Sequence, residues 1–203
     1  MTVAASPLGR PVGADSAQTR RRIITAAMRC VAQAGYSQAT IREIARAADM
    51  TSGSLYHYFA NKSDLFSATG EEIEQIVLPR LRAAIAHTDD VVDRLDAVLD
   101  ESKRLIVDYP YLTPFLRAMR AHSTAQAGSK ALRDVVTEVV EDARVKGRLS
   151  VETDAGAAVE AICALTRGLS EQAASLSPRA YDATLNAAKK LIRGSLFARP
   201  SQR

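Results

Sequence analysis

Apolar residues recur three and four positions apart along almost the whole chain, which is the spacing of one face of an α-helix. The first such face contains Ile24, Met28 and Val31, and it stops at Gly35, a residue suited to the left-handed end of a helix. No convincing alternating pattern typical of a β-strand interrupts this periodicity. The chain is therefore expected to be all-α.

Start and stop signals divide the region after residue 60 into further helices. The segment Asn61-Lys62-Ser63-Asp64 predicts the start of a helix that Pro79 kinks or ends. Five more helices are expected downstream, beginning at about residues 91, 113, 132, 154 and 178. The pattern thus predicts a C-terminal bundle of about six helices.

Two short helices separated by a tight turn are predicted before that bundle. Thr40 and Glu43 have the spacing of a capping box at the start of the first, and Thr51 or Ser52 can cap the second. Asp49 is a residue type that tolerates the turn between them. Helices this short are stable only when packed, so the sequence predicts an N-terminal three-helix helix-turn-helix domain in front of the bundle.

The composition, 47% hydrophobic and 25% charged residues, is typical of soluble globular proteins. No apolar run approaches the roughly 20 residues of a membrane span, and the first residues lack the apolar core of a secretion signal. We therefore expect a cytoplasmic protein with no membrane partner. Cys30 and Cys163 fall at apolar helical positions far apart in the sequence, where reduced, buried thiols are expected.

The residue patterns of enzymes are absent from the sequence. It contains no glycine-rich nucleotide loop, no zinc-ligand spacing and no nucleophile elbow, and His57, His87 and His122 are dispersed. We expect no catalytic residue, no cofactor and no metal site, and we expect that the protein is not an enzyme.

The excess positive charge is confined to the first third of the chain. Residues 1–70 carry eight Arg and Lys residues against four Asp and Glu residues, a surplus equal to the net charge of +4 of the whole chain. A localised positive field attracts polyanions such as nucleic acid, although a solvated basic surface would have the same composition.

The second short helix carries side chains suited to the major groove of DNA: small hydroxyl residues, a glycine without a Cβ, and ring side chains that can donate hydrogen bonds. These residues are Thr51, Ser52, Gly53, Ser54, Tyr56, His57 and Tyr58. Lys62 places a cation beside the positive end of the next helix, where a phosphate would bind both. Leu55 and Phe59 are expected in the core instead.

Together these segments resemble the DNA-binding signature of the TetR family. The resemblance is carried by Thr40-Ile41-Arg42-Glu43-Ile44-Ala45, by the stretch from Thr51 to Phe59, and by Asn61-Lys62, and it covers about the first 70 residues. It implies double-stranded operator DNA as the partner, with Thr40 and Arg42 holding backbone phosphates. The chain departs from the family pattern at Asp49, where Gly is usual, and at Tyr58, where His is frequent.

The resemblance also implies a ligand cavity in the C-terminal domain. Apolar residues near helix ends are candidate lining residues, although such residues at helical spacing are more often ordinary core. The candidates are Tyr109, Tyr111, Phe115, Met119, His122 and Cys163. Their character predicts a small, apolar effector with one polar group.

The last two helices are expected to form a homodimer interface. Small residues on the penultimate helix permit close approach of another helix, and the resemblance implies a four-helix arrangement between two protomers. The small residues are Gly156, Ala157, Ala161, Ala164 and Gly168.

These expectations divide the chain into a flexible basic arm (1–16), a helix-turn-helix DNA-binding domain (17–66) and a ligand-binding and dimerisation domain (67–203). The expected function is that of a DNA-binding transcriptional regulator, a repressor that a small lipophilic ligand releases from a palindromic operator. Two alternatives remain open: a DNA-binding regulator without a small-molecule effector, and a helical interaction or adaptor protein. The sequence does not distinguish a repressor from an activator.

Overall fold

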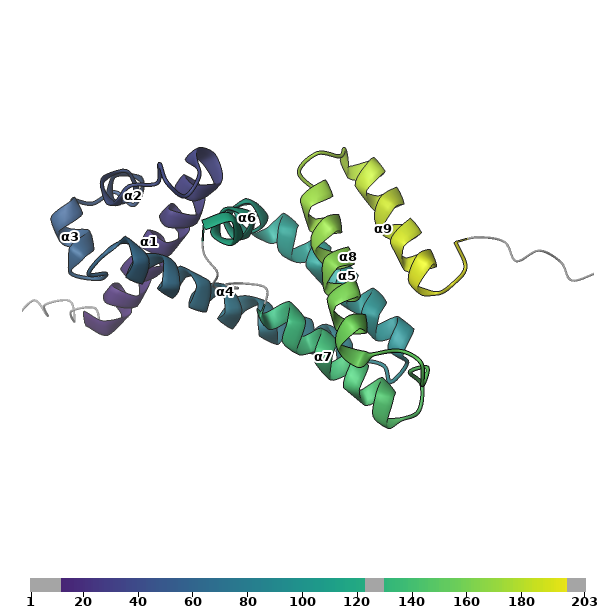
Figure 1. Ribbon diagram of the computed structural model, residues 1–203. Helices are drawn as coiled ribbons and strands as arrows, with labels where there is room; N and C mark the ends of the chain where they lie inside the picture. The colour runs from purple at the N-terminus through teal and green to yellow at the C-terminus, as the bar shows by residue number, and fades with distance from the viewer. Residues whose placement is uncertain (1–11, 123–129, 197–203) are drawn as a thin grey trace, which may run out of the picture. The chain divides into compact units, whose positions relative to one another are not determined.

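The computed structural model describes residues 12–122 and 130–196, and within these ranges the regular structure is entirely helical. The helices are α1 (Val12–Ala34), α2 (Ile41–Ala47), α3 (Ser52–Tyr56), α4 (Lys62–Ile85), α5 (Val91–Asp108), α6 (Leu112–His122), α7 (Lys130–Val145), α8 (Ala155–Gln172) and α9 (Pro178–Ile192) (Figure 1). The all-α prediction is confirmed, and so is its division into three N-terminal helices followed by six more.

The chain forms two compact units, Met1–Thr69 and Gly70–Arg203, and the division falls inside α4. The predicted arm over residues 1–16 is wrong for its last five residues, because α1 already begins at Val12. Residues 1–11 lie outside the described part of the chain. The arginines at 20–22 therefore belong to a helix.

The first unit packs the long helix α1 against the short helix α2, which in turn contacts α3. Ile23, Ala27 and Val31 of α1 are fully buried, whereas α2 buries only Ile44 and Ala45 along its length. Helices that contribute so few buried residues have little stability alone. Their positions depend on packing, of α2 against α1 and of α3 against α2.

Pro79 lies inside α4, which continues to Ile85. Of the two outcomes expected at this residue, a kink or the end of the helix, the end is wrong. A proline inside a helix costs about 3 kcal/mol, because one N–H is missing from the hydrogen-bond ladder. Leu81 and Ile85 beyond it are buried. Burial of each such side chain contributes about 1.5–3 kcal/mol, which is enough to keep the helix continuous.

In the second unit, α7 packs against α8 and α5, and α5 also contacts α8 and α9. Val135, Val136 and Val139 form the buried side of α7, so this β-branched run is helical. The guanidinium of Arg94 on α5, only 8% exposed, lies 2.9 Å from a carboxylate oxygen of Asp142 on α7. Asp142 is partly exposed, so the pair is half-buried, and it joins α5 to α7.

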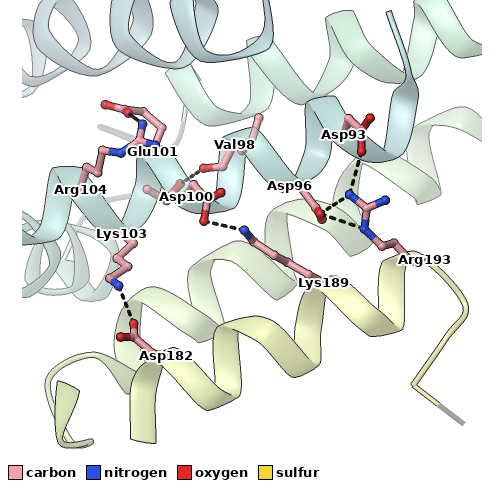
Figure 2. A network of polar contacts seen from close by, with 11 residues as sticks. Asp93, Asp96, Val98, Asp100, Glu101, Lys103, Arg104, Asp182, Lys189 and Arg193 are labelled. Carbon is pink, nitrogen blue, oxygen red and sulfur yellow. Dashed lines mark hydrogen bonds and ion pairs between the residues drawn. The ribbon is translucent and has the colours of Figure 1, made fainter. Parts of the chain in front are cut away.

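A line of ion pairs joins α5 to the last helix, α9 (Figure 2). Arg193 donates to Asp93 at 2.7 Å and to Asp96 at 2.6 Å, which anchors the end of α9. The remaining pairs are Lys189 with Asp100 and Lys103 with Asp182. Beneath them lies an apolar cluster formed by Leu99, Leu169, Tyr181, Leu185 and Ala188. One side of α9 is thus held by its own chain, and its other side is left exposed.

Candidate functional site

The capping box at the start of α2 is present as predicted. The Thr40 hydroxyl accepts from the Glu43 N–H at 3.2 Å, and the Glu43 carboxylate accepts from the Thr40 N–H at 3.0 Å. The Thr40 hydroxyl also donates to the Glu43 carboxylate at 3.0 Å. The two hydrogen bonds that this carboxylate accepts, first that from the Thr40 backbone and then that from the Thr40 hydroxyl, lower the pKa of Glu43. Thr40 therefore has a defined structural role, while Arg42, one residue into the helix, is exposed.

The turn between α2 and α3 requires one left-handed residue, and that residue is Asp49, with φ of 54°. Its N–H donates to the Arg46 carbonyl, and the Met50 N–H donates to the Ala45 carbonyl at 3.0 Å. This pair of hydrogen bonds is the Schellman motif, in which glycine is the usual left-handed residue. Asp tolerates this conformation better than most other residues. The departure at this position therefore leaves the turn intact.

Thr51 caps α3, since its hydroxyl accepts from the Ser54 N–H at 3.0 Å. The Thr51 and Ser54 hydroxyls also form a hydrogen bond of 2.9 Å with each other. Leu55 and Phe59 point into the core, as expected. Because the buried residue of α3 is Leu55, the remaining side chains of this helix lie away from the protein interior.

The residues predicted to contact DNA gather on that outer side. Tyr56 is 52% exposed, which is unusual for a large aromatic residue. The exposed members of the predicted set on and around α3 are Thr51, Gly53, Ser54, Tyr56 and His57, and the partly buried members are Ser52 and Tyr58. A Cβ added at Gly53 would meet only the Thr51 hydroxyl at 3.8 Å, so packing within the protein does not require glycine there.

Lys62 has intramolecular contacts that the sequence did not reveal. Its ammonium donates to the Tyr36 carbonyl at 2.6 Å and lies 4.5 Å from the centre of the Tyr36 ring. The ring of Phe66 packs beside that of Tyr36. Burial lowers the pKa of Lys62. Lys62 thus ties the start of α4 to the loop after α1, and a phosphate contact by this residue stays a prediction.

The second unit contains an apolar cavity of about 80 Å³. Its walls come from α4, α5, α6, α7 and α8. The apolar lining residues include Val77, Leu81, Leu105, Leu112, Leu116 and Leu132. The charged lining residues are Arg120, Arg167 and Glu171.

None of the predicted ligand-binding residues lies in the lining of this cavity. Phe115, Met119 and Cys163 are buried in the core, and Tyr109 and Tyr111 are partly buried elsewhere. The side chain of His122 lies outside the described part. On α6 the cavity is lined by Leu112, Leu116 and Arg120 at helical spacing, which is the face next to the one containing Phe115 and Met119. Periodicity predicts both faces, and only packing distinguishes them.

A second hollow of about 550 Å³ lies between α4 and α5, and charged side chains form part of its lining. Its lining includes Arg80, whose guanidinium donates to Glu101 at 2.5 Å and to Asp108 at 2.6 Å. Arg104 donates to the same Glu101. Because these charges are already paired, this hollow is a less suitable site for a ligand than the apolar cavity.

Two further properties concern only the described residues. Among them, no three His, Cys, Asp or Glu side chains gather as a metal ion would require. In the same ranges, no helix is long and apolar enough to cross a membrane.

Comparison with known proteins assigns the first unit to a family. Residues 23–69 match the family model described as bacterial regulatory proteins, tetR family. The transcriptional repressor KstR of Rhodococcus jostii is 30% identical over 156 residues, which span 75% of this chain and 70% of that protein. The regulator AcrR of Shigella flexneri is 39% identical over 64 residues, 32% of this chain and 30% of that protein.

Solved structures extend the likeness to most of the chain. FadR from Bacillus subtilis, in complex with stearoyl-CoA, has a TM-score of 0.74 at 18% identity, covering 87% of this chain and 99% of that one. FadR from Bacillus halodurans has a TM-score of 0.73 at 21% identity, covering 89% and 97%. At these identities the likeness concerns the fold. Taken with the family model and the KstR match, it leads to one conclusion: the chain belongs to the TetR family of bacterial transcriptional regulators.

Proposed function

We propose that this protein is a dimeric repressor that binds a two-fold symmetric operator in double-stranded DNA and leaves it when a small apolar molecule occupies the cavity. In this proposal the unit Met1–Thr69 binds DNA, and the unit Gly70–Arg203 forms the dimer and holds the effector. The observation that carries the proposal is the exposed set of small, hydroxyl and aromatic residues on α3, a helix held by caps and by Leu55.

The composition of that surface suits a major groove. Recognition helices bring their N-terminal side chains to base edges, while neighbouring donors bind phosphates on both sides. Gly53 supports this role because nothing within the protein requires a glycine there, whereas a close DNA backbone would. Ser52 and Ser54 are the proposed base-reading residues. Thr40, Arg42, Tyr56 and Lys62 are proposed to contact phosphates.

The exposed face of α8 supports the proposed dimer. Gly156, Ala157, Ala161, Ala164 and Gly168 are all exposed in the single chain, and the last four follow one another at helical spacing. On α9, Leu191 is 51% exposed, on the side away from the ion pairs with α5. Small residues allow the helices of two protomers to pack closely, and a two-fold interface uses the same surface twice. The result would be a four-helix interface formed by α8 and α9.

In this proposal, release from DNA depends on α4, because this helix contributes residues both to the DNA-binding unit and to the lining of the cavity. Lys62 and Leu65 in its first turns belong to the DNA-binding unit, and Val77 and Leu81 further along line the cavity. A ligand that displaces Val77 and Leu81 would shift α4 and so change the spacing of the two DNA-reading helices. For near-complete release, the ligand must prefer the non-binding conformation by about 5.5 kcal/mol.

The similar proteins support two parts of this proposal, the repressor function and the apolar effector. KstR is named a transcriptional repressor, and the Bacillus subtilis FadR structure contains stearoyl-CoA, a molecule with a long apolar chain. A repressor acts where the chromosome lies, so we place this protein in the cytoplasm.

Binding to DNA fragments that flank the gene of the protein itself tests the proposal. We expect one fragment to bind at least about a thousandfold more tightly than unrelated duplexes. Its affinity should fall by about three to five orders of magnitude between 50 and 200 mM salt, if the dimer makes six to ten phosphate contacts. Equal, weak binding to every duplex would contradict the proposal and favour a helical adaptor. Specific binding that no apolar compound reverses would favour a regulator without an effector.

A further inference from the structure

We infer that the cavity binds an apolar molecule that ends in one anionic oxygen group, a carboxylate or a phosphate, and that Arg167 binds this group. The inference rests on the proposed function, because it names the chemical class of the effector. It follows from which polar side chains of the cavity wall already have hydrogen-bond or ion-pair partners and which do not.

The hydroxyl groups of the cavity have few hydrogens left to donate. The hydroxyl of Ser102 donates to the Val98 carbonyl at 2.7 Å. The hydroxyls of Thr166 and Ser170 donate to carbonyls of their own helix, each at 2.9 Å. These three hydroxyls can therefore only accept a hydrogen bond from a ligand. Thr113, the fourth hydroxyl of the lining, forms no side-chain hydrogen bond with a described residue and could donate one to a ligand. The charged donors that an anionic group requires are the arginines.

The two arginines of the cavity differ in their partners. Arg120 donates to the Glu171 carboxylate at 3.0 Å, so its charge is neutralised at the cavity wall. Arg167 forms no hydrogen bond or ion pair with another described residue, although it is half-buried. The cavity wall thus contains two guanidinium groups against one carboxylate.

Glu160, two helical turns before Arg167 on α8, interacts with Arg167 through their charges alone, without a hydrogen bond or ion pair. Glu160 accepts from two nitrogens of Arg133 on α7, and this bidentate pair occupies both of its carboxylate oxygens. Burying a cation without a partner is costly, and a planar guanidinium binds carboxylate or phosphate through two parallel hydrogen bonds. The unmatched charge at Arg167 is therefore complementary to an anionic group of a ligand.

The size of the cavity limits the rest of the molecule. Sites for small molecules have volumes of about 300–1,000 Å³, several times the 80 Å³ of this cavity. A slender alkyl chain is the shape that enters with least displacement of the wall. Ile106 and Leu116 line the cavity and are only partly buried, so they are the side chains with the most freedom to move.

Binding of matched compounds to the full-length protein tests the inference. The probes are straight-chain carboxylates of about 6 to 16 carbons, the alkyl phosphates of the same lengths, and the corresponding neutral alcohols. We expect the anionic compounds to bind the wild-type protein at least about tenfold more tightly than the alcohols, because hydrogen bonds to charged groups are strong. The carboxylate and phosphate series show which anionic group is preferred.

Two variants separate Arg167 from charge in general. Arg167→Gln should weaken binding of the anionic compounds by about ten- to a hundredfold and leave binding of the alcohols unchanged. Arg117→Gln is the matched control, because Arg117 lies on α6 beside the cavity but is exposed and does not line it. Arg167→Lys, which keeps the charge but loses the planar fork, should give an intermediate affinity. Thermal melting of each variant verifies that it is folded.

The outcomes distinguish this inference from the proposed function. If alcohols bind as tightly as anions and release the operator, the ligand-controlled repressor stands and the role of Arg167 is wrong. An equal loss of affinity for the anionic compounds in Arg117→Gln and Arg167→Gln would also contradict the role of Arg167. If no compound of any class binds while the operator is still bound, both this inference and the effector of the proposed function fail, and DNA binding stands.

Discussion

Replacing Ala164 with Arg tests the dimer interface, and the structure gives the size of the effect. Ala164 is exposed at the middle of the small-residue face of α8. Arginine is nearly as good a helix former as alanine, so Ala164→Arg should leave the folded monomer about as stable as before. Any large effect must therefore come from contacts with a second protomer.

In the proposed dimer this arginine would be buried without a partner. Leaving a charge buried and unpaired in an interface costs about 2–5 kcal/mol, and two-fold symmetry places the substitution in the interface twice. The dimer should therefore be destabilised by about 4–10 kcal/mol. Since every 1.4 kcal/mol is a factor of ten, the dissociation constant should rise by about three to seven orders of magnitude.

Light scattering at micromolar concentration measures the result, and operator binding provides a second readout. We expect Ala164→Arg to be a folded monomer with greatly reduced operator affinity, because one DNA-reading helix makes half the contacts. Ala164→Ser, which stays small, should remain dimeric. So should Ala86→Arg, which adds the same charge at an exposed alanine outside α8 and α9. An Ala164→Arg protein that stays dimeric with an unchanged dissociation constant would refute the interface.

Four further predictions concern the DNA-binding unit. Asp49→Gly should leave the free energy of unfolding unchanged or raise it by up to about 1 kcal/mol, whereas Asp49→Val should lower it by about 1–2 kcal/mol in chemical denaturation, because φ is positive there. Tyr56→Phe should weaken binding of all DNA sequences about equally, whereas Ser52→Ala should change the site selected from a random library; an unchanged site would contradict the base-reading role. Lys62→Met should lower the free energy of unfolding by about 1–3 kcal/mol through the lost contacts with the loop after α1, and an unchanged melting curve would contradict that role. The pKa of Glu43 is lowered in the folded protein, so its contribution to stability is present above its usual pKa of 4.5 and is lost as the pH falls through the lowered value. Glu43→Ala should therefore have a lower free energy of unfolding than wild type at pH 7, and this difference should vanish in acid.

Local interactions explain which features were predictable. Thr40 with Glu43 and Thr51 with Ser54 interact three residues apart, and such short-range contacts can be recognised in a sequence. The left-handed turn at Asp49 is equally local. The helix-turn-helix could be predicted for this reason, and the family resemblance covers the same residues.

The features that were missed depend on residues far apart in the chain. The role of Lys62 comes from a carbonyl at Tyr36, 26 residues away. The early start of α1 was also missed. At Pro79 the sequence left a kink and an end open, and the burial of Leu81 and Ile85 beyond it explains why α4 continues.

By itself, the sequence determined that this protein is all-helical, that its first unit is a helix-turn-helix, and which small polar residues α3 presents. Only the tertiary structure decided which face of α6 lines the cavity, and that Arg120 has a carboxylate partner there while Arg167 has none among the described residues. The physical reason is the range of the interactions. Helices, caps and turns arise between residues within one turn of each other, whereas a cavity and its charges exist only where helices distant in sequence pack together.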